Sequence, residues 1–284
     1  MGLVTMKSIL DDASTGGYAV PAFDAVDHAS VEAIITAAEK TGKPVIIMVP
    51  EVAIPLIDVE SFFDFLVYRI NKSDAKIALE LDHGRNLDLI ALAINSGFTG
   101  VMYDGSELPI EENIANTKKV VELAKAKDVS VEAEIGHVGG GEGNVQEASD
   151  VDEMAFTRPE DAKYFAEATG VDALAVAIGT VHGLYKGTPK LDFGRLGTIN
   201  ELIDIPLVLH GGSGVSPEEF VKAIANGINK INLFTEISMS AVSQAVDYAN
   251  AKEKKLHFAE MILVGRKTVE QLAENYLKLF NPDK

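Results

Sequence analysis

The chain lacks cysteine altogether, and its 25 Lys and Arg residues are outnumbered by 43 Asp and Glu. Without cysteine there is neither a disulfide framework nor a thiolate nucleophile or metal ligand. The formal net charge of −18 argues against nucleic acid or an anionic membrane as a partner, because both attract basic surfaces. A small anionic substrate would need local attraction from a metal ion, backbone N–H groups or a few lysines.

Long apolar runs are also missing. No stretch approaches the roughly 18 residues of a membrane span, and the N-terminus lacks the charged and then apolar pattern of a signal peptide. We therefore expect a cytoplasmic protein. Apolar residues still make up 47% of the 284 residues, and no linker, composition break or low-complexity tract divides the sequence. The expectation is one domain covering residues 1–284, with a large core.

Short apolar runs alternate with helix-like segments along the whole chain. Near-continuously apolar strands at this spacing are typical of a parallel sheet that is covered on both faces. Eight such units favour the α/β class and, within it, a closed (β/α)8 TIM barrel over a doubly wound sheet. The predicted strands are Tyr18–Phe23, Pro44–Val49, Ile77–Leu81, Gly100–Tyr103, Val129–Ile135, Ala173–Ile178, Pro206–Leu209 and Asn229–Leu233.

The helix-like segments between these strands carry start and stop signals. Proline in the first turn is harmless because its missing N–H has no intrahelical partner there. Thr169-Gly170 and Asn226-Gly227 match the glycine that often follows a helix. The clearest predicted helices are His28–Thr41, Ile110–Lys127, Pro159–Thr169 and Pro217–Asn226.

Three of the 6 histidines each follow an apolar, β-branched run and each precede a glycine. They are His83, His182 and His210, after the third, sixth and seventh predicted strands. One such histidine could be a hydrogen-bonded core residue, but three at the same end of a barrel are hard to explain in that way. Imidazole is the commonest side-chain ligand of zinc, and a catalytic zinc site uses three protein ligands and one open position. The pattern predicts a metalloenzyme.

Other polar side chains fall at the same predicted face, where the active sites of such barrels lie. Single acidic residues often end strands as helix caps, but convergence from several strands favours a site. These residues are Asp24, Asp82, Asp104, Glu134 and Asn232.

Several motifs occur in a fixed order along the chain. They are Leu81-Asp82-His83-Gly84, Tyr103-Asp104-Gly105-Ser106, Val131-Glu132-Ala133-Glu134, Gly179-Thr180-Val181-His182-Gly183 and Leu209-His210-Gly211-Gly212-Ser213-Gly214. In these motifs the chain resembles the class II, zinc-dependent ketose-bisphosphate aldolases, and within them the tagatose- and fructose-bisphosphate enzymes. The resemblance extends from about residue 3 to residue 240.

The resemblance implies a carbon–carbon lyase that splits a ketose phosphate into dihydroxyacetone phosphate and an aldehyde. It implies that the three histidines hold Zn²⁺, which polarises the C2 carbonyl, and it allows a monovalent cation, Na⁺ or K⁺, as well. Asp82 would exchange the proton of the C4 oxygen, and Glu142 would move the C3 proton within a lid formed by Gly136–Ala155. Asp104 and Glu134 would support the metal ligands or form an alternate metal position.

The phosphate site is predicted by local chemistry as well as by resemblance. Gly211-Gly212-Ser213-Gly214 leads toward a helix, and small residues let backbone N–H groups approach an anion. The loops after strands 7 and 8 are also the usual phosphate site of these barrels. The resemblance implies these substrate contacts: Gly183, Gly211, Ser213, Asn232, Phe234 and Thr235.

The chain departs from the family pattern mainly at the aldehyde end of the substrate. Asp24 replaces the usual asparagine, and Pro50 replaces the usual serine. No clear counterpart exists for the C-terminal arginine that meets a second phosphate, since Glu274 occupies about that place and Arg266 is distant. Two further departures lie elsewhere, namely Glu80 where many relatives have histidine, and Phe234 where they have a small or acidic residue.

Three alternatives remain open at this point. One is an aldolase for a ketose 1-phosphate whose aldehyde half carries no phosphate. Another is a metal-dependent sugar-phosphate epimerase on the same barrel, and the third is a non-catalytic sugar-phosphate-binding subunit. The expected partner is a small sugar phosphate, with neither nucleic acid nor membrane. By resemblance the protein forms a homodimer or homotetramer.

Overall fold

The computed structural model describes residues 2–140, 147–148, 153–185, 187 and 189–283. Within these residues, eight parallel strands form a closed ring, because β4 pairs with both β3 and β5. The strands of the ring are β2 (Val20–Asp24), β3 (Val45–Pro50), β4 (Lys76–Gly84), β5 (Gly100–Tyr103), β6 (Ser130–Ile135), β8 (Ala173–Val176), β10 (Leu207–Leu209) and β11 (Ile228–Leu233). The predicted TIM barrel is confirmed, and each strand overlaps its predicted range.

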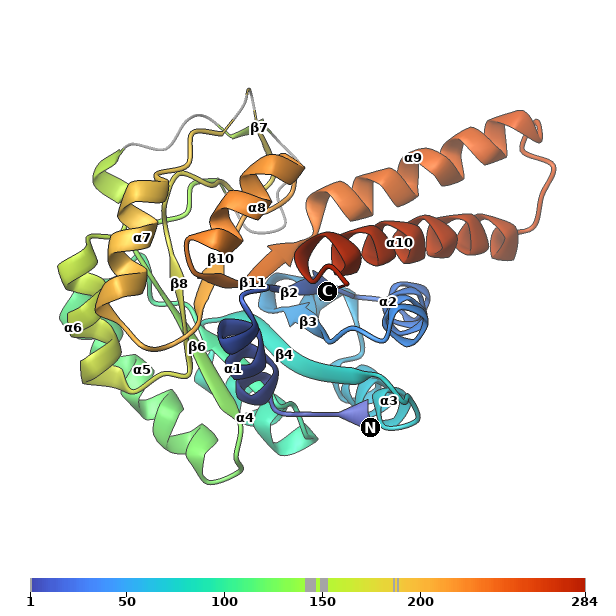
Figure 1. The fold of residues 1–284 in the computed structure, drawn as a ribbon. Coiled ribbons are helices and arrows are strands. Elements are labelled where there is room, and N and C mark those ends of the chain that lie inside the picture. The colour runs from blue at the N-terminus through green and yellow to red at the C-terminus, as the bar shows by residue number, and fades with distance from the viewer. Residues whose placement is uncertain (1, 141–146, 149–152, 186, 188, 284) are drawn as a thin grey trace.

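Helices surround this barrel and complete the alternating pattern (Figure 1). Two of the predicted helices, α2 and α6, begin and end where the sequence pattern placed them. The helices are α1 (Met6–Gly16), α2 (His28–Thr41), α3 (Val59–Ile70), α4 (Leu87–Ser96), α5 (Ile110–Lys125), α6 (Pro159–Thr169), α7 (Phe193–Leu202), α8 (Pro217–Ala225), α9 (Thr235–Ala251) and α10 (Phe258–Phe280).

Five short elements complete the part of the chain that the structure describes. The two-residue strand β1 (Gly2–Leu3) pairs with β4 outside the ring. The strands β7 (Glu147–Ala148) and β9 (Leu184–Tyr185) pair with each other in parallel. The two 3-10 helices are η1 (Glu51–Leu56), directly after β3, and η2 (Glu153–Ala155).

Helix ends follow the local chemistry of the sequence. At the start of α8, the Ser216 side chain accepts from the backbone N–H of Glu219, and the Glu219 side chain accepts in return from the Ser216 N–H. Pro217 occupies the first turn of that helix, where it removes no hydrogen bond. At the end of α6, Gly170 adopts a left-handed conformation (φ 69°), which glycine reaches without steric cost.

Alternation along the strands divides the core into two parts. On β4, Ile77 and Leu79 belong to the large apolar cluster shared with the helices, whereas Ala78 belongs to a second cluster inside the barrel. Successive side chains of a strand point to opposite faces. Glu80 and Asp82 therefore share the barrel interior with Ala78, further toward the carboxyl end of the strand.

Helix α1 closes the amino-terminal mouth of the barrel, which sequence analysis did not predict. Met6, Ile9, Leu10 and Ala13 form one face of α1 and are buried against interior side chains of the barrel. Their spacing matches one side of a helix. The apolar residues inside the barrel therefore gain their packing partners from a helix outside the eight repeated units.

Helices α9 and α10 form an antiparallel pair that projects from the barrel (Figure 1). The carboxyl-terminal part of α10 returns along α2, where Ala273 and Leu277 are buried in the main cluster. Among the described helices, none combines the length and the apolar character needed to cross a membrane.

Candidate active site

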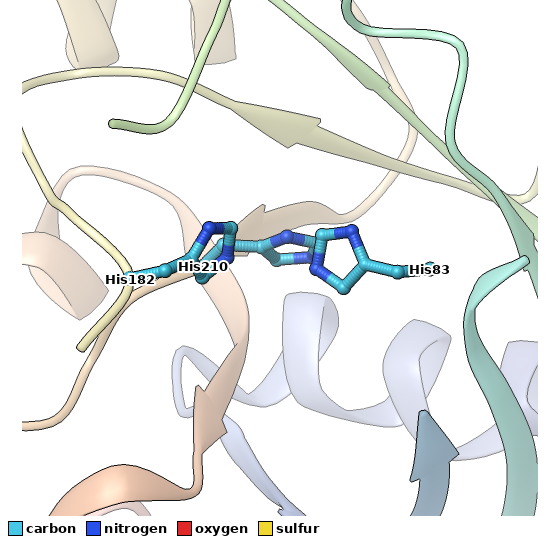
Figure 2. A group of neighbouring side chains, drawn as sticks. All are labelled: His83, His182 and His210. Carbon is cyan, nitrogen blue, oxygen red and sulfur yellow. The ribbon is translucent and has the colours of Figure 1, made fainter. Parts of the chain in front are cut away.

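The three predicted histidines meet at the carboxyl end of the barrel. Figure 2 shows their imidazole rings gathered in one group. The centroid of the His83 ring lies 5.0 Å from that of His182 and 4.7 Å from that of His210. One ring nitrogen from each histidine can be chosen so that all three lie within 4.8 Å of one another. His83 lies near the end of β4, whereas His182 and His210 lie in the loops that follow β8 and β10.

Asp104 orients the imidazole ring of His83 by contacting its Nδ1. Its Oδ2 lies 3.1 Å from Nδ1 of His83 and also accepts from Nη2 of Arg85 at 2.8 Å, while Oδ1 accepts from the Ser106 hydroxyl. Burial opposes the charge on Asp104, but these donors hold the pKa of its carboxyl well below the usual range. Because a carboxylate only accepts, Nδ1 of His83 carries its proton, and Nε2 is the nitrogen available to a metal.

The backbone of His83 is itself unusual. Its φ of 46° lies in the left-handed region, which non-glycine residues seldom adopt. Such conformations persist where the surrounding structure holds them, and they cluster at functional sites. Here Asp104 holds the side chain, and the backbone conformation directs it toward the other two histidines.

His210 is completely buried between two carboxylates of β6. Its Nε2 forms a 2.9 Å hydrogen bond with Oε1 of Glu132, and its Nδ1 lies 3.0 Å from Oε2 of Glu134. Burial opposes protonation of the ring, but the two carboxylates raise the pKa of His210 to about 9. By contrast, burial and the nearby His83 lower the pKa of His182 to about 3. A cation is therefore favoured at the His210–Glu134 position, whether a proton or a metal.

A buried lysine, which sequence analysis did not single out, contacts Glu132, the carboxylate that is hydrogen-bonded to His210. The Nζ of Lys230 on β11 lies 2.7 Å from Oε2 of Glu132 and 2.8 Å from Oε2 of Glu80, and all three side chains are inaccessible to solvent. Burial works against the ammonium, but the two carboxylates raise the pKa of Lys230. Lys230 occupies the inward-facing position two residues before Asn232, so strand alternation was the signal that could have found it.

Asp82 lies beside the histidines, at the inner end of β4. It is buried, its Oδ1 accepts from Nδ2 of Asn232 at 3.3 Å, and its Oδ2 is 3.9 Å from Nε2 of His83. A carboxylate here can take a proton from a substrate group that lies next to a metal held by the histidines. The predicted neighbours Asp82, His83 and Asn232 thus come together from β4 and β11.

A narrow pocket opens on one side of the histidines and contains all six predicted substrate contacts. The Ser213 hydroxyl accepts from the backbone N–H groups of Phe234 and Glu236, which links the loop after β10 to the start of α9. Thr235 begins α9, so this pocket lies at the N-terminus of a long helix, which favours anions. Its lining residues are Asp24, Asp82, His83, His182, Gly183, Gly211, Gly212, Ser213, Asn232, Leu233, Phe234 and Thr235.

Gly211 illustrates why small residues are needed in this pocket. Its φ is +66°, and a Cβ built there would lie 2.3 Å from the backbone oxygen of Val181. Any side chain would strain the turn and push apart the loops that carry His182 and His210. The glycine therefore lets those loops approach each other closely.

A larger cavity of about 500 Å³ opens on the other side of the histidines. His83 and His182 line both the cavity and the narrow pocket. Arg85 lines the larger cavity, although sequence analysis did not select it. It is the second residue after His83, so its place next to a predicted ligand was the available signal.

The donor set fits a metal ion. The three imidazoles form one group with mutually close nitrogens, and His83, Asp104 and Glu134 form a second group at similar spacing. Both predicted arrangements, with Asp104 and Glu134 as supports or as an alternate position, are compatible with these distances. Glu142 lies outside the described residues.

The departures from the family pattern can also be placed. Asp24 lines the narrow pocket together with the predicted phosphate contacts, and Pro50 ends β3 beside Asp82 in register, so neither is among the described residues that line the larger cavity. Arg266 contacts α2, with its Nη2 3.5 Å from the Thr36 hydroxyl, and Glu274 bonds Lys40. Neither is among the described residues that line the two cavities.

The fold and the site together define a (β/α)8 barrel with a group of side chains that could hold a metal ion, beside a pocket at a helix N-terminus. The family model for class II fructose-bisphosphate aldolases matches residues 4–284. The chain therefore belongs to the class II fructose-bisphosphate aldolase family, and it is a carbon–carbon lyase.

Solved structures agree with this assignment. The YdjI aldolase from Escherichia coli K12 is 32% identical, with a TM-score of 0.88 over 99% of this chain and 98% of that one. The fructose-bisphosphate aldolase of Campylobacter jejuni is 21% identical, with a TM-score of 0.83 over 99% of this chain and 96% of that one. The first supports the family, and the second the fold.

Proposed function

We propose that the protein is a zinc-dependent aldolase that reversibly cleaves a ketose phosphate into dihydroxyacetone phosphate and an aldehyde. One observation carries this proposal: three clustered imidazoles lie beside a pocket at a helix N-terminus, and one of them, His83, is 3.9 Å from a buried carboxylate, Asp82. These are the groups needed to hold a carbonyl, anchor a phosphate and accept a proton. A site built only for binding would not need a group that accepts a proton.

Zinc is the metal that these ligands favour. Neutral imidazoles suit Zn²⁺, whereas Mg²⁺ and Ca²⁺ prefer oxygen ligands and more of them. His83, His182 and His210 would hold the ion, with Asp104 and Glu132 fixing the outer nitrogens of two rings. When bound, zinc would supply Lewis-acid polarisation of the C2 carbonyl.

Asp82 is the proposed base for cleavage. When the C3–C4 bond of the ketose breaks, the C4 hydroxyl loses its proton and becomes the aldehyde carbonyl, and the bonding electrons pass toward C2. Asp82 would accept that proton, while the amide of Asn232 keeps its carboxylate in place. The reverse reaction returns the proton to the same oxygen.

Glu142 is proposed to deliver the proton to C3 of dihydroxyacetone phosphate. The C3 and C4 protons sit on different atoms, so two separately placed acid–base groups are needed. Glu142→Ala should suppress exchange of the C3 proton with solvent. The exchange is followed by NMR in deuterated buffer, with no aldehyde present. Exchange at the wild-type rate would assign this step to another residue.

The phosphate of the ketose is proposed to bind in the narrow pocket. Backbone N–H groups of the loop after β10, the Ser213 hydroxyl and Thr235 at the start of α9 would surround it. With its phosphate bound there, the substrate would place its C2 carbonyl next to the histidines that line the same pocket. The proposed substrates are of the fructose or tagatose 1,6-bisphosphate type, or the corresponding ketose 1-phosphates.

The experiment that tests this function uses a panel of ketose phosphates and zinc-loaded protein. A coupled reductase that consumes triose phosphate detects cleavage directly. We expect triose phosphate to form from at least one ketose phosphate. Conversion of a ketose phosphate into its epimer, with no triose phosphate formed, would contradict the proposal.

A homo-oligomer, either a dimer or a tetramer, is proposed as the working form. The projecting α9–α10 pair exposes apolar side chains, including Val242 (61% exposed), Phe258 (77%) and Leu263 (53%). Exposed apolar groups gathered on one feature are typical of interaction surfaces. Light scattering on the purified protein should give a multiple of 30.4 kDa, and the monomer mass would contradict this proposal.

A further inference from the structure

The larger cavity is placed where the carbon chain of a bound ketose must continue. His83 and His182 line it together with the narrow pocket, so these two rings separate the two spaces. A substrate with its phosphate in the narrow pocket and its carbonyl at the histidines therefore extends its remaining carbons into the cavity. With a volume of about 500 Å³, the cavity has room for a chain of several carbons.

The charges of this cavity are predominantly negative. Asp104 and Glu134 line the cavity but are compensated by the histidines beside them, whereas Glu51 and Glu107 add carboxylates outside the metal-binding group. Among the described lining residues of both cavities, Arg85 is the only lysine or arginine. A dianion placed here would meet several carboxylates and one guanidinium.

That guanidinium is already partly compensated. Nε and Nη2 of Arg85 donate to Oδ2 of Asp104, and Nη1 lies 3.6 Å from Oε2 of Glu107. Guanidinium has five N–H donors in a planar fork, so these contacts fix its orientation without using every donor. The Arg85 backbone N–H also donates to Glu51, which ties the loop after β4 to η1.

We propose that the larger cavity binds the aldehyde half of the substrate, that Glu51 and Glu107 make it select a neutral, polyhydroxylated aldehyde over a phosphorylated one, and that Arg85 binds the hydroxyl groups of that aldehyde. This inference rests on the proposed aldolase function. Sugar hydroxyls both donate and accept, so they can donate to Glu51 and Glu107 and accept from Arg85 and Ser106. A phosphate can only accept, and its charge is repelled by the same carboxylates.

The first test uses wild-type protein in the direction of synthesis. Dihydroxyacetone phosphate is condensed with glyceraldehyde, erythrose or glyceraldehyde 3-phosphate, and kcat/KM is measured for each aldehyde. We expect at least one neutral aldehyde to exceed glyceraldehyde 3-phosphate by about tenfold or more, because like charges repel in this cavity. Equal values, or a preference for the phosphorylated aldehyde, would overturn the inference.

Proton exchange separates this result from the proposed function itself. Exchange of the C3 proton of dihydroxyacetone phosphate requires the metal and the narrow pocket but no aldehyde. Absence of exchange in the wild-type protein would overturn the aldolase proposal. Exchange without a preference for neutral aldehydes would overturn only the present inference.

Two variants test the cavity residues. Glu107→Gln removes a carboxylate beside Arg85 and should raise relative activity with glyceraldehyde 3-phosphate by about threefold, as expected for a charge near the surface. Glu112→Gln makes the same charge change on the exposed surface of α5, outside the cavity. It should leave unchanged the ratio of kcat/KM for glyceraldehyde 3-phosphate to kcat/KM for the neutral aldehyde. If this ratio is the same in both variants, the charges of the cavity have no role in selecting the aldehyde.

Arg85→Gln should raise KM for neutral aldehydes by roughly 10- to 100-fold, since hydrogen bonds from a charged group are lost. The carboxylates left behind should disfavour glyceraldehyde 3-phosphate further. A parallel loss of proton exchange would place the effect at Asp104 and His83 and would overturn the role of Arg85 in aldehyde binding. An unchanged KM for every aldehyde would overturn it as well.

Discussion

The two ends of the barrel interior are built from the same strands but differ sharply in chemistry. At the amino-terminal end, Ala78 and Val208 pack in an apolar cluster with Met6 and Leu10 of α1. Two residues further along β4, Glu80 belongs to a buried ion pair with Lys230. A short step along a strand therefore separates a region that stabilises the fold from one that supports the site.

The contrast shows how buried charge is tolerated in this barrel. Lys230 contacts two carboxylates, and Glu132 in turn contacts His210, so each charge is compensated by the next. Replacing a buried ion pair by apolar groups is often neutral or stabilising, whereas removing one partner is costly. The charged region therefore serves to position His210, whereas the apolar end serves to stabilise the fold.

Metal removal should have the largest effect and should act only on the carboxyl-terminal end. Chelation is expected to abolish cleavage because the three imidazoles lose their shared ion, and Zn²⁺ or Co²⁺ should restore activity. The measurement is triose phosphate release before and after dialysis against a chelator, with metal content determined in parallel. Full activity in a metal-free sample would refute the metal assignment.

Asp82→Ala should have the next largest effect on catalysis. Loss of general acid–base catalysis is expected to lower kcat by roughly 10²–10⁴-fold. Zinc content should change little, because the three histidines remain. A steady-state assay and metal analysis check both expectations. Wild-type kcat in this variant would show that Asp82 is not the base.

Lys230→Met should reduce stability by about 3–5 kcal/mol, because it leaves the buried carboxylate of Glu132 without its cation. The measurement is the free energy of unfolding in urea at constant zinc concentration. Adding Glu132→Gln to Lys230→Met should recover part of the loss, since the uncompensated carboxylate is removed. No recovery in the double variant would argue against charge compensation as the role of Lys230.

The matched control lies at the apolar end. Leu10→Ala removes a fully buried side chain of α1 and should cost about 2–5 kcal/mol, because it leaves a cavity. Its kcat should stay near that of the wild type, since α1 lies at the opposite end from the histidines. Comparable losses of kcat in Leu10→Ala and Asp82→Ala would show that the two ends are not functionally separate.

The last prediction is a pH dependence of stability, measured as a slope per pH unit. Burial raises the pKa of Glu80 from 4.5 to about 8, against the opposing influence of Lys230. The folded state therefore binds this proton more tightly than the unfolded state. The resulting stabilisation is fully present below pH 4.5 and is lost as the pH rises through 8.

Glu80→Gln should remove that contribution and flatten stability between these two pH values. The slope to be removed is at most about 1.4 kcal/mol per pH unit for one group. Urea unfolding of both proteins at a series of pH values measures it. Identical slopes in the variant and the wild type would contradict the assignment to Glu80.

Much of the fold could be predicted because its signals are local. The predicted strands are near-continuously apolar, since a parallel strand under helices is buried on both faces. Prolines in the first turns and glycines after the last turns indicated where α6 and α8 begin and end. By contrast, α1 shows only the pattern of an amphipathic helix, and nothing local indicates that it closes the mouth of the barrel.

The candidate site was predictable to a similar extent. His83, His182 and His210 stood out because each follows a strand, and the barrel topology brings those strand ends together. Lys230 was missed because a single lysine in a strand usually reaches solvent. Arg85 was missed because its position in the cavity depends on contacts with Asp104 and Glu107, which follow a different strand.

The sequence by itself determined the parallel barrel and the end at which its polar groups gather, because periodicity and strand order fix which side chains share a face. Only the tertiary structure decided which nitrogen of His83 is available, which buried charges compensate one another, and which cavity adjoins the histidines. These properties depend on distances of a few ångströms between residues far apart in the chain. Hydrogen bonds and ion pairs are sensitive to such distances, whereas sequence patterns do not record them.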